Sequence, residues 1–464
     1  MEFLNENEIL DNATSDVFRK LRRDALDILV TSLNAVDPRK AVRRSLTLAD
    51  GRLNIDGEEL DLRRFSEVLV IGGGKASGTM AEAIEGLLGS HISGGYVNVL
   101  KGTESNFNLN TIRVKGASHP VPSEQGVRGV EEMLSLVEDA AEDTLVLVLI
   151  SGGGSALMTL PVDDVPLDDA KRLTELLLRS GATIDELNAV RKHISAVKGG
   201  QLAGRLYPAT VLSLILSDVV GDRLDTIASG PTTPDTTTFQ DALDVLKRRG
   251  LWSETPESIR QHLESGIKRE IDETLKPGDA VFDNVHNVVI GSNSTAAKAA
   301  LERARSLAYN SVLLSTSVEG EASRVGAGFA EMVQRIAERE NPIGPPAAVV
   351  AGGETTVTVI GSGSGGRNQE LALSACRGIR DLDALIATLA TDGIDGPTEA
   401  AGAVVDGSTM SRGLTLGLDV ERHLRDNDSN TFFEALGDAL MTGPTGTNVN
   451  DLTLILVSSG KIGD

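Results

Sequence analysis

The chain has 464 residues, but only one of them is cysteine and only 3% are aromatic. The single Cys376 excludes an intramolecular disulfide and a metal site built from several cysteines. No apolar run approaches the ~20 residues of a membrane helix, and the first residues lack the basic and apolar regions of a signal peptide. We therefore expect a soluble, cytoplasmic protein with a largely aliphatic core.

Basic residues are also few: 44 Lys and Arg stand against 67 Asp and Glu, for a formal net charge of −23. This balance argues against nucleic acid as a partner, because binding to a phosphate backbone requires a basic surface. It is compatible with a salt-rich cytoplasm and equally with an ordinary acidic enzyme. An anionic substrate would need a local cationic pocket within this negative field.

What the sequence does contain is an alternation of short apolar runs, glycine-rich loops and helical stretches. This alternation predicts an α/β fold with parallel, doubly wound sheets whose ligands bind at the carboxyl ends of the strands. The length predicts two domains, at residues 8–280 and 281–464, each a mostly parallel sheet flanked by helices. The expected strands are residues 68–71, 144–150, 211–216, 288–290, 311–315, 347–350, 387–390 and 453–457. The expected helical stretches are residues 8–49, 166–206, 293–307 and 321–338, with a linker and one or two helices in 231–280.

Two glycine-rich loops follow expected strands in the first half. One reads Gly72-Gly73-Gly74-Lys75 and the other spans residues 151–155, Ser-Gly-Gly-Gly-Ser. Glycine lets backbone N–H groups approach an anion closely, and a lysine at such a helix start can neutralise a phosphate. Neither loop forms a P-loop or a clean dinucleotide fingerprint. A solvated lysine and an ordinary tight turn remain the alternatives.

The second half contains the most glycine-rich stretch, residues 352–370. A β-rich run, Thr355–Ile360, is expected to lead into a loop with four glycines, and Arg367 stands on the first turn of the next helix. A glycine loop, a helix start and a planar cation together favour binding of a phosphate or carboxylate. The alternative is a strand–turn–helix without a ligand.

Paired aspartates follow two of the expected strands: Asp218 with Asp222, and Asp392 with Asp395. Carboxylates at strand ends hold Mg²⁺ or take a proton from an attacking hydroxyl, but single aspartates more often cap helices or form turns. His119 and His193 belong to no metal-ligand spacing, and we expect them to be structural or to orient a substrate.

Ten segments together resemble the class II glycerate kinase family, also called glycerate 2-kinases, with a C-terminal MOFRL domain. They occur in the order of the family's motifs over nearly the whole chain, and only residues 233–285 carry none of them. The segments are residues 71–77 (IGGGKAS), 118–122 (SHPVP), 151–156 (SGGGSA), 188–193 (NAVRKH), 198–203 (KGGQLA), 216–222 (LSDVVGD), 228–232 (ASGPT), 352–373, 391–397 (TDGIDGP) and 442–451 (TGPTGTNVND).

This resemblance implies a Rossmann-like N-terminal domain, a MOFRL region at about residues 347–456, and an active site in the cleft between the two domains. It implies transfer of the ATP γ-phosphoryl group to D-glycerate with Mg²⁺, giving 2-phosphoglycerate. The resemblance implies that Lys75, Arg367 and Asp392, the residues expected to be catalytic, line this cleft. From the chemistry of its carboxylate, Asp218 is expected to hold the metal, with Asp392 as the alternative. The residues expected to bind substrate or nucleotide are Gly73, Gly74, Ser77, Ser151, Gly152, Gly153, Gly154, Ser155, Asn188, Arg191, Lys198, Glu354, Gly366 and Asn368.

Several alternatives stay open at this point. A hydroxypyruvate reductase using NAD(P)H would need a dinucleotide fingerprint and an acidic ribose-binding residue, and the chain has neither in clean form. A non-catalytic sugar-phosphate-binding protein could use the same loops without turnover. A kinase could also accept another small 2-hydroxy acid, and motif spacing does not distinguish the C2 from the C3 hydroxyl as acceptor. Homo-oligomerisation is possible, and its form is left open.

Overall fold

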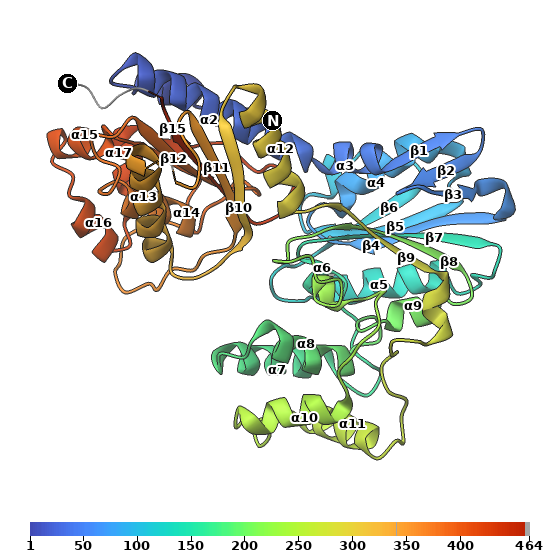
Figure 1. The fold of residues 1–464 in the computed structure, drawn as a ribbon. Coiled ribbons are helices and arrows are strands. Elements are labelled where there is room, and N and C mark those ends of the chain that lie inside the picture. Colours follow the sequence, from blue (N-terminus) through green and yellow to red (C-terminus); the bar gives the residue numbers. More distant parts are fainter. Residues whose placement is uncertain (340, 460–464) are drawn as a thin grey trace. The chain divides into compact units, whose positions relative to one another are not determined.

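The computed structural model describes residues 1–339 and 341–459, and the chain divides into two compact units (Figure 1). One unit combines Met1–Asp37 with Gly291–Asp464, and the other is Pro38–Ile290. We call them the MOFRL-side unit and the central unit. The expected division at residues 280 and 281 falls shortly before Gly291. Residues 8–37, which we expected in the N-terminal domain, instead belong with the C-terminal half.

The N-terminal helices α1 (Glu6–Asp11) and α2 (Asp16–Ala35) are held in the MOFRL-side unit by a buried ion-pair network. Arg22 on α2 donates from Nε to Asp406 Oδ2 at 2.8 Å and from Nη1 to Asp438 Oδ1 at 2.7 Å. All three side chains are fully buried. Buried charges need such partners, so these contacts, more than 380 residues apart in sequence, explain why the first helices pack where they do.

The central unit is built on a six-stranded sheet with the order β6-β5-β4-β7-β8-β9. The pairings β4–β5, β4–β7, β5–β6 and β7–β8 are all parallel, as the sequence predicts. Every residue of β7 is buried, as is typical of a strand covered on both faces. The strands are β4 (Glu67–Gly73), β5 (Gly94–Leu100), β6 (Ile112–Ala117), β7 (Thr144–Ser151), β8 (Thr210–Leu216) and β9 (Val285–Gly291).

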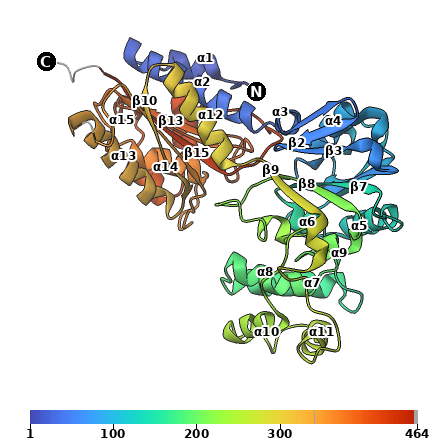
Figure 2. The same cartoon turned by 45° about the vertical axis from the view of Figure 1, so that its right-hand side comes forward.

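Helices of the central unit form two groups. Contacts place α4 and α5 against the sheet, with α3 packed on α4. The helices α7, α8, α10 and α11 pack on one another around their own apolar core, side by side in Figures 1 and 2. The helical stretch expected over residues 166–206 consists of three helices, α7, α8 and α9. The region expected as a linker, residues 231–280, contains two helices, α10 and α11. The helices are α3 (Pro38–Ser45), α4 (Ser77–Leu88), α5 (Glu124–Leu136), α6 (Gly154–Leu157), α7 (Leu167–Arg179), α8 (Ile184–His193), α9 (Gln201–Leu206), α10 (Phe239–Arg248) and α11 (Glu257–Ile267).

A small antiparallel sheet precedes the main one, and the sequence did not predict it. Its strands are β1 (Leu46–Ala49), β2 (Arg52–Ile55) and β3 (Glu58–Asp61). The helical stretch expected over residues 8–49 therefore extended too far, because residues 46–49 form β1. Short 3₁₀ turns connect elements of this unit: η1 (Leu62–Arg64), η2 (Gly89–His91), η3 (Glu104–Asn106), η4 (Ile227–Ser229) and η5 (Ala280–Asn284).

The sheet of the MOFRL-side unit has the order β10-β11-β15-β12-β13-β14. Only β10–β11 is a parallel pair, and the other four pairings are antiparallel, so the expectation of a mostly parallel sheet is corrected here to a mixed one. Two of the antiparallel pairings arise because β15 enters between β11 and β12 in the opposite direction, and the other two because β13 runs opposite to both β12 and β14. The strands are β10 (Asn310–Val318), β11 (Ala347–Gly353), β12 (Ala384–Ala390), β13 (Gly402–Asp406), β14 (Ala439–Leu440) and β15 (Asp451–Val457).

The strand expected at Thr355–Ile360 does not form. Only Thr356 makes an isolated bridge, to Glu321, and the side chains of Val359 and Ile360 are 73% and 76% exposed. The helices of this unit, besides α1 and α2, are α12 (Asn293–Ser306), α13 (Ala322–Arg339), α14 (Arg367–Ala375), α15 (Thr409–Thr415), α16 (Val420–Arg425) and α17 (Ser429–Leu436). Within the described ranges, no helix combines the length and apolar character needed to cross a bilayer.

Candidate active site

The carboxyl ends of β4 and β7 are joined through the two glycine loops of the central unit. The Lys75 N–H donates to the Gly152 carbonyl at 2.8 Å, and the Ala76 N–H donates to Ser151 Oγ at 3.0 Å. A Cβ on Gly74 would lie 2.1 Å from Ser151 Oγ, so only glycine permits this approach. The two loops, separate in sequence, therefore form one rigid surface at the strand ends.

The loop after β7 presents backbone donors that the protein itself does not use. No acceptor in the described part of the chain is bonded to the N–H groups of residues 152–155. Gly153 has φ +81°, which turns successive N–H groups toward the same side. Unused donors of this kind suit a ligand with anionic oxygens.

Three ionisable side chains surround this loop. A Cβ on Gly152 would lie 2.3 Å from Asp218 Oδ2, and a Cβ on Gly153 would lie 3.0 Å from His119 Cδ2 and 3.3 Å from Lys75 Cγ. Desolvation, and then the positive charge of Lys75, lowers the pKa of His119, so its imidazole is neutral near pH 7. A cation, a neutral base and a carboxylate thus border a cluster of free backbone donors.

Behind the loop, a chain of hydroxyls fixes the position of Ser155. Ser155 Oγ lies 2.8 Å from Ser229 Oγ, and Ser229 Oγ donates to Asn188 Oδ1 at 2.9 Å. Because the Ser229 proton is used in the second bond, Ser155 is the donor in the first. Ala228 and Ser229 both have positive φ, +51° and +62°. Non-glycine residues in this region store strain that often accompanies functional sites.

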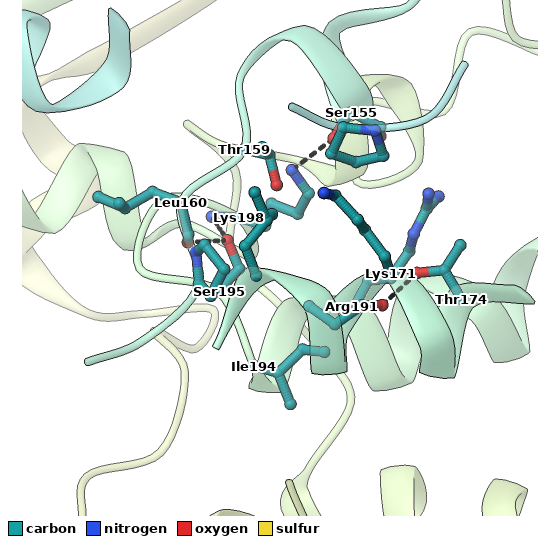
Figure 3. A pocket seen from close by; sticks show the side chains of 13 residues that line it. Ser155, Thr159, Leu160, Lys171, Thr174, Arg191, Ile194, Ser195 and Lys198 are labelled. Carbon is teal, nitrogen blue, oxygen red and sulfur yellow. Dashed lines mark hydrogen bonds between the residues drawn. The ribbon is translucent and has the colours of Figure 1, made fainter. Parts of the chain in front are cut away.

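On the other side of Ser155 lies a cavity of about 30 Å³ lined by three cations, Lys171, Arg191 and Lys198 (Figure 3). None of its 13 lining residues is acidic. Lys171 pairs at 3.1 Å with Asp168, which is 91% exposed, and such surface pairs are weak. For Arg191, the described residues provide neither a hydrogen-bond acceptor nor an ion pair.

Lys198 is the most deeply buried of the three cations. Its Nζ donates to the carbonyls of Ser155 at 2.9 Å and Met158 at 3.0 Å, so it also fixes the glycine loop from below. Burial, and secondarily the charge of Arg191, lowers the pKa of Lys198 to about 7. The two carbonyl acceptors are neutral, so they do not compensate for the loss of water around the buried ammonium group, and the pKa stays low.

His193, in contrast, has no access to this site. Its Nε2 lies 2.8 Å from Glu273 Oε1, its Nδ1 lies 2.6 Å from the Ala189 carbonyl, and its ring is fully buried. Lys192, the preceding residue, pairs with the buried Asp235 at 3.2 Å. These contacts tie α8 to the segments around α10, so the expectation of a structural role fits His193.

The glycine loop of the MOFRL-side unit differs, because the N–H groups of its first part, residues 360–364, are already bound. The N–H groups of Ile360 and Gly361 donate to Asn427 Oδ1, and those of Ser362 and Ser364 donate to the carboxylates of Asp426 and Asp428. A Cβ on Gly361 or Gly363 would lie within 2.4 Å of these residues. The glycines therefore allow two loops to pack together.

Two N–H groups at the start of α14 are also bound, whereas those of residues 365–367 have no acceptor among the described residues. Asp395 accepts from the N–H groups of Asn368 at 3.0 Å and Gln369 at 2.8 Å. A Cβ on Gly366 would lie 2.3 Å from the Asp395 carboxyl carbon. The helix start that the sequence offered to an external anion thus binds an internal carboxylate, and Asp395 acts as a cap.

Arg367 lies at the edge where β11 ends and β15 begins. Its guanidinium contacts both carboxylate oxygens of Asp451, the nearer at 2.5 Å, and pairs with Glu354 at 2.9 Å. Burial raises the pKa of Asp451 to about 6, although Arg367 opposes the shift. Asp392 follows β12 and accepts from the Ile394 N–H at 3.1 Å, which forms a turn.

The expected site residues therefore fall into two groups. The central unit brings together around one loop Gly73, Gly74, Lys75, Ser77, Ser151, Gly152, Gly153, Gly154, Ser155, Asn188, Arg191, Lys198 and Asp218. Ser77 is fully buried and bonds to the Leu149 carbonyl, so it supports the loop from inside. The MOFRL-side unit holds Glu354, Gly366, Arg367, Asn368 and Asp392. The sequence analysis missed Lys171, Ser229 and Asp451, and it undervalued His119. His119, Ser229 and Asp451 stood in segments that carry the family resemblance, whereas Lys171 stood in none.

The described residues contain no group of three or more His, Cys, Asp or Glu side chains arranged to hold a metal ion. A magnesium ion bound chiefly through substrate phosphates needs only one or two carboxylates. Asp218, beside Gly152, is of the right chemical type and in the right place for that role.

Comparisons with known proteins agree with this architecture. Residues 24–264 match the family described as a domain of unknown function, DUF4147, and residues 347–451 match the MOFRL family. Glycerate 2-kinase of Pyrococcus horikoshii is 44% identical over 442 residues, which cover 95% of this chain and 98% of that protein. D-glycerate 2-kinase of Thermotoga maritima is 41% identical, with 94% and 98% covered.

A solved structure supports the same relationship. The crystal structure of glycerate kinase from Thermotoga maritima superposes with a TM-score of 0.85 at 39% identity, covering 94% of this chain and 99% of that one. Both family models and the full-length relatives thus agree with the motifs found in the sequence. The chain belongs to the glycerate kinase family with a C-terminal MOFRL domain.

Proposed function

We propose that this protein is a glycerate 2-kinase, which transfers the γ-phosphoryl group of ATP to the C2 hydroxyl of D-glycerate. The observation that carries the proposal is the loop of residues 152–155, whose four N–H groups have no acceptor in the described structure and lie beside Lys75. Phosphoryl transfer depends chiefly on positioning and on neutralising charge, and donors of this kind supply both.

In the proposed reaction, the acceptor hydroxyl oxygen forms a bond to the γ-phosphorus while the bond to the ADP oxygen breaks. The loop N–H groups and Lys75 stabilise the charge on the transferred group. His119, neutral near pH 7, accepts the hydroxyl proton. Asp218 would hold Mg²⁺ together with phosphate oxygens, and the ion would supply further neutralisation of phosphate charge.

The MOFRL-side unit contributes Arg367 and Asp392 to the proposal as catalytic residues and Glu354, Gly366 and Asn368 as binding residues. Arg367 is bonded to Asp451 and Glu354. Its action on a phosphate would therefore require exchange of one of these carboxylates for the ligand. The pKa of Asp451 is raised because burial makes the charged form of this carboxylate less stable than that of an exposed aspartate.

The reductase alternative has less support from the residues. The loop after β4 lacks the third glycine of a dinucleotide fingerprint at its usual place. A lysine and free N–H donors suit a transferred phosphoryl group better than a hydride. A passive sugar-phosphate-binding protein would share the donors but would not need a neutral base at His119. We propose that the reaction takes place in the cytoplasm.

The deciding experiment supplies purified protein with ATP, Mg²⁺ and D-glycerate and couples the product to enolase. Formation of phosphoenolpyruvate without phosphoglycerate mutase would establish 2-phosphoglycerate as the product. A signal only after mutase is added would mean transfer to the C3 hydroxyl. No ADP formation in low or high salt, together with NADH oxidation by hydroxypyruvate, would replace the kinase by the reductase.

A further inference from the structure

The cavity below Ser155 concentrates positive charge, and only Lys171 among its three cations pairs with a carboxylate, that of the exposed Asp168. Lys198 and Arg191 lie together there, and none of the 13 lining residues is acidic. In a protein with a net charge of −23, three cations around one cavity are a local exception. Buried charges are normally paired, so this arrangement calls for an anion from outside the chain.

The polar groups and the size of the cavity indicate which kind of anion it can bind. The hydroxyl of Thr159 also lines the cavity and bonds to no described residue, so it can donate to an oxygen atom of a ligand. The other lining hydroxyls, Ser155, Thr174 and Ser195, already donate within the protein. A volume of about 30 Å³ holds about two water molecules. The two oxygens of a carboxylate match that space. The planar guanidinium of Arg191 is suited to a carboxylate.

The position of the cavity connects it to the glycine loop. Ser155 belongs to both, and the Lys198 ammonium group lies directly beneath the loop, bonded to its carbonyl (Figure 3). Asn188 and Arg191 are three residues apart on α8 and so project from the same helix face. Asn188 bonds to Ser229 and thereby to Ser155, so one helix positions both the cation and the loop serine.

We propose that this cavity is a carboxylate subsite, in which Arg191, Lys171 and Lys198 bind the carboxylate of the phosphoryl acceptor. The proposal rests on the kinase function proposed above. It assigns the acceptor to the class of small hydroxy acids, with the carboxylate held on one side of Ser155 and the hydroxyl-bearing carbons directed toward the glycine loop.

Calorimetric titration tests the subsite without turnover. The probes are glycolate, its neutral amide glycolamide, and inorganic phosphate, each titrated at pH 6.5 with and without a non-hydrolysable ATP analogue and Mg²⁺. The variants are Arg191→Gln and Lys171→Gln, the second at a partly exposed position that does not endanger folding. Arg172→Gln is the matched control, since it removes an exposed positive charge on α7 outside the cavity.

We expect glycolate to bind and glycolamide to bind much more weakly. Both cavity variants should weaken glycolate binding about 10- to 100-fold, the range for losing hydrogen bonds to a charged group, and Arg172→Gln should leave it unchanged. Equal binding of glycolate and its amide, unchanged affinity in both variants, or loss of phosphate binding instead of glycolate binding would each overturn the proposal.

The outcomes also separate the subsite from the kinase function. If D-glycerate is not phosphorylated but glycolate binding depends on Arg191, the function is wrong and the carboxylate subsite stands. If D-glycerate is phosphorylated and the KM for glycerate is unchanged in both cavity variants, the kinase stands and the subsite is wrong. The KM for ATP serves as the internal control, because it should not respond to Arg191→Gln.

Discussion

Raising the pH should weaken the binding of D-glycerate, because Lys198 loses its charge in the physiological range. Burial lowers the pKa of this lysine from 10.5 to about 7. A bound carboxylate favours the charged form and raises the pKa, by about 1 to 2 units for a close opposite charge. Between the free and bound pKa values, binding therefore takes up a proton, and below pH 7 the lysine is already charged in both states.

The size of the effect follows from these values. At pH 8.5 only about 3% of Lys198 is charged in the free protein if its pKa is about 7. With the bound pKa 1 to 2 units higher, linkage predicts binding about tenfold weaker at pH 8.5 than at pH 6.5. At pH 8, binding should take up about half a proton or more.

Stability should depend on pH in the opposite sense. The unfolded chain, with its ordinary lysine pKa of 10.5, binds more protons than the native state between about pH 7 and 10.5. The contribution of Lys198 to the free energy of unfolding therefore rises with pH across that window.

Two assays measure the coupling. The KM for D-glycerate is followed from pH 6 to 9 with the KM for ATP as reference, and proton uptake is measured calorimetrically in two buffers of different ionisation enthalpy. The variant Lys198→Met should bind glycerate more weakly but without this pH dependence, whereas Arg172→Gln should keep it. A KM that stays constant over the whole range, with no proton uptake, would refute both the lowered pKa and the role of Lys198.

Two further predictions concern other parts of the molecule. Lys75→Met should lower kcat about 100- to 1000-fold, the usual effect of losing one stabilising donor, without changing the melting temperature. The control Lys101→Met, at an exposed loop position, should leave kcat unchanged. Near-normal turnover of Lys75→Met in a steady-state assay would remove Lys75 from the mechanism. Arg22→Met should lower the free energy of unfolding by about 3–5 kcal/mol, because it leaves the buried Asp406 and Asp438 without the cation that they share. Urea denaturation measures this change. An effect below about 1 kcal/mol would mean that the network does not hold α2 in place.

Much of the central unit could be predicted from the sequence. The strands β4, β7 and β8 are short apolar runs buried on both faces, and each lies within two residues of its expected limits. Because parallel strands place their carboxyl ends together, the loops with Lys75, Gly152 and Asp218 were expected to meet, and the structure brings them together. Local pattern and a general rule of topology were sufficient here.

The MOFRL-side unit was less predictable, for two physical reasons. Antiparallel insertion of β15 between β11 and β12 depends on pairing across long sequence separations, which local periodicity does not contain. The glycine loop at 360–366 has the composition of an anion site, but the N–H groups of residues 360–364 are used by Asp426, Asn427 and Asp428, which lie more than 60 residues later. Composition indicated where donors are available, and only the contacts identified their acceptors.

By itself, the sequence determined the α/β class, the family and the loops that carry the chemistry, because glycine loops, apolar strands and motif order are local properties. The tertiary structure decided which N–H donors of those loops are left for a ligand. It also decided that Lys171, Arg191 and Lys198 line one cavity and that α2 belongs with β13 and β14. Both depend on charges from distant segments coming together. Folding decides which buried charges find a partner within the chain and which remain for a ligand.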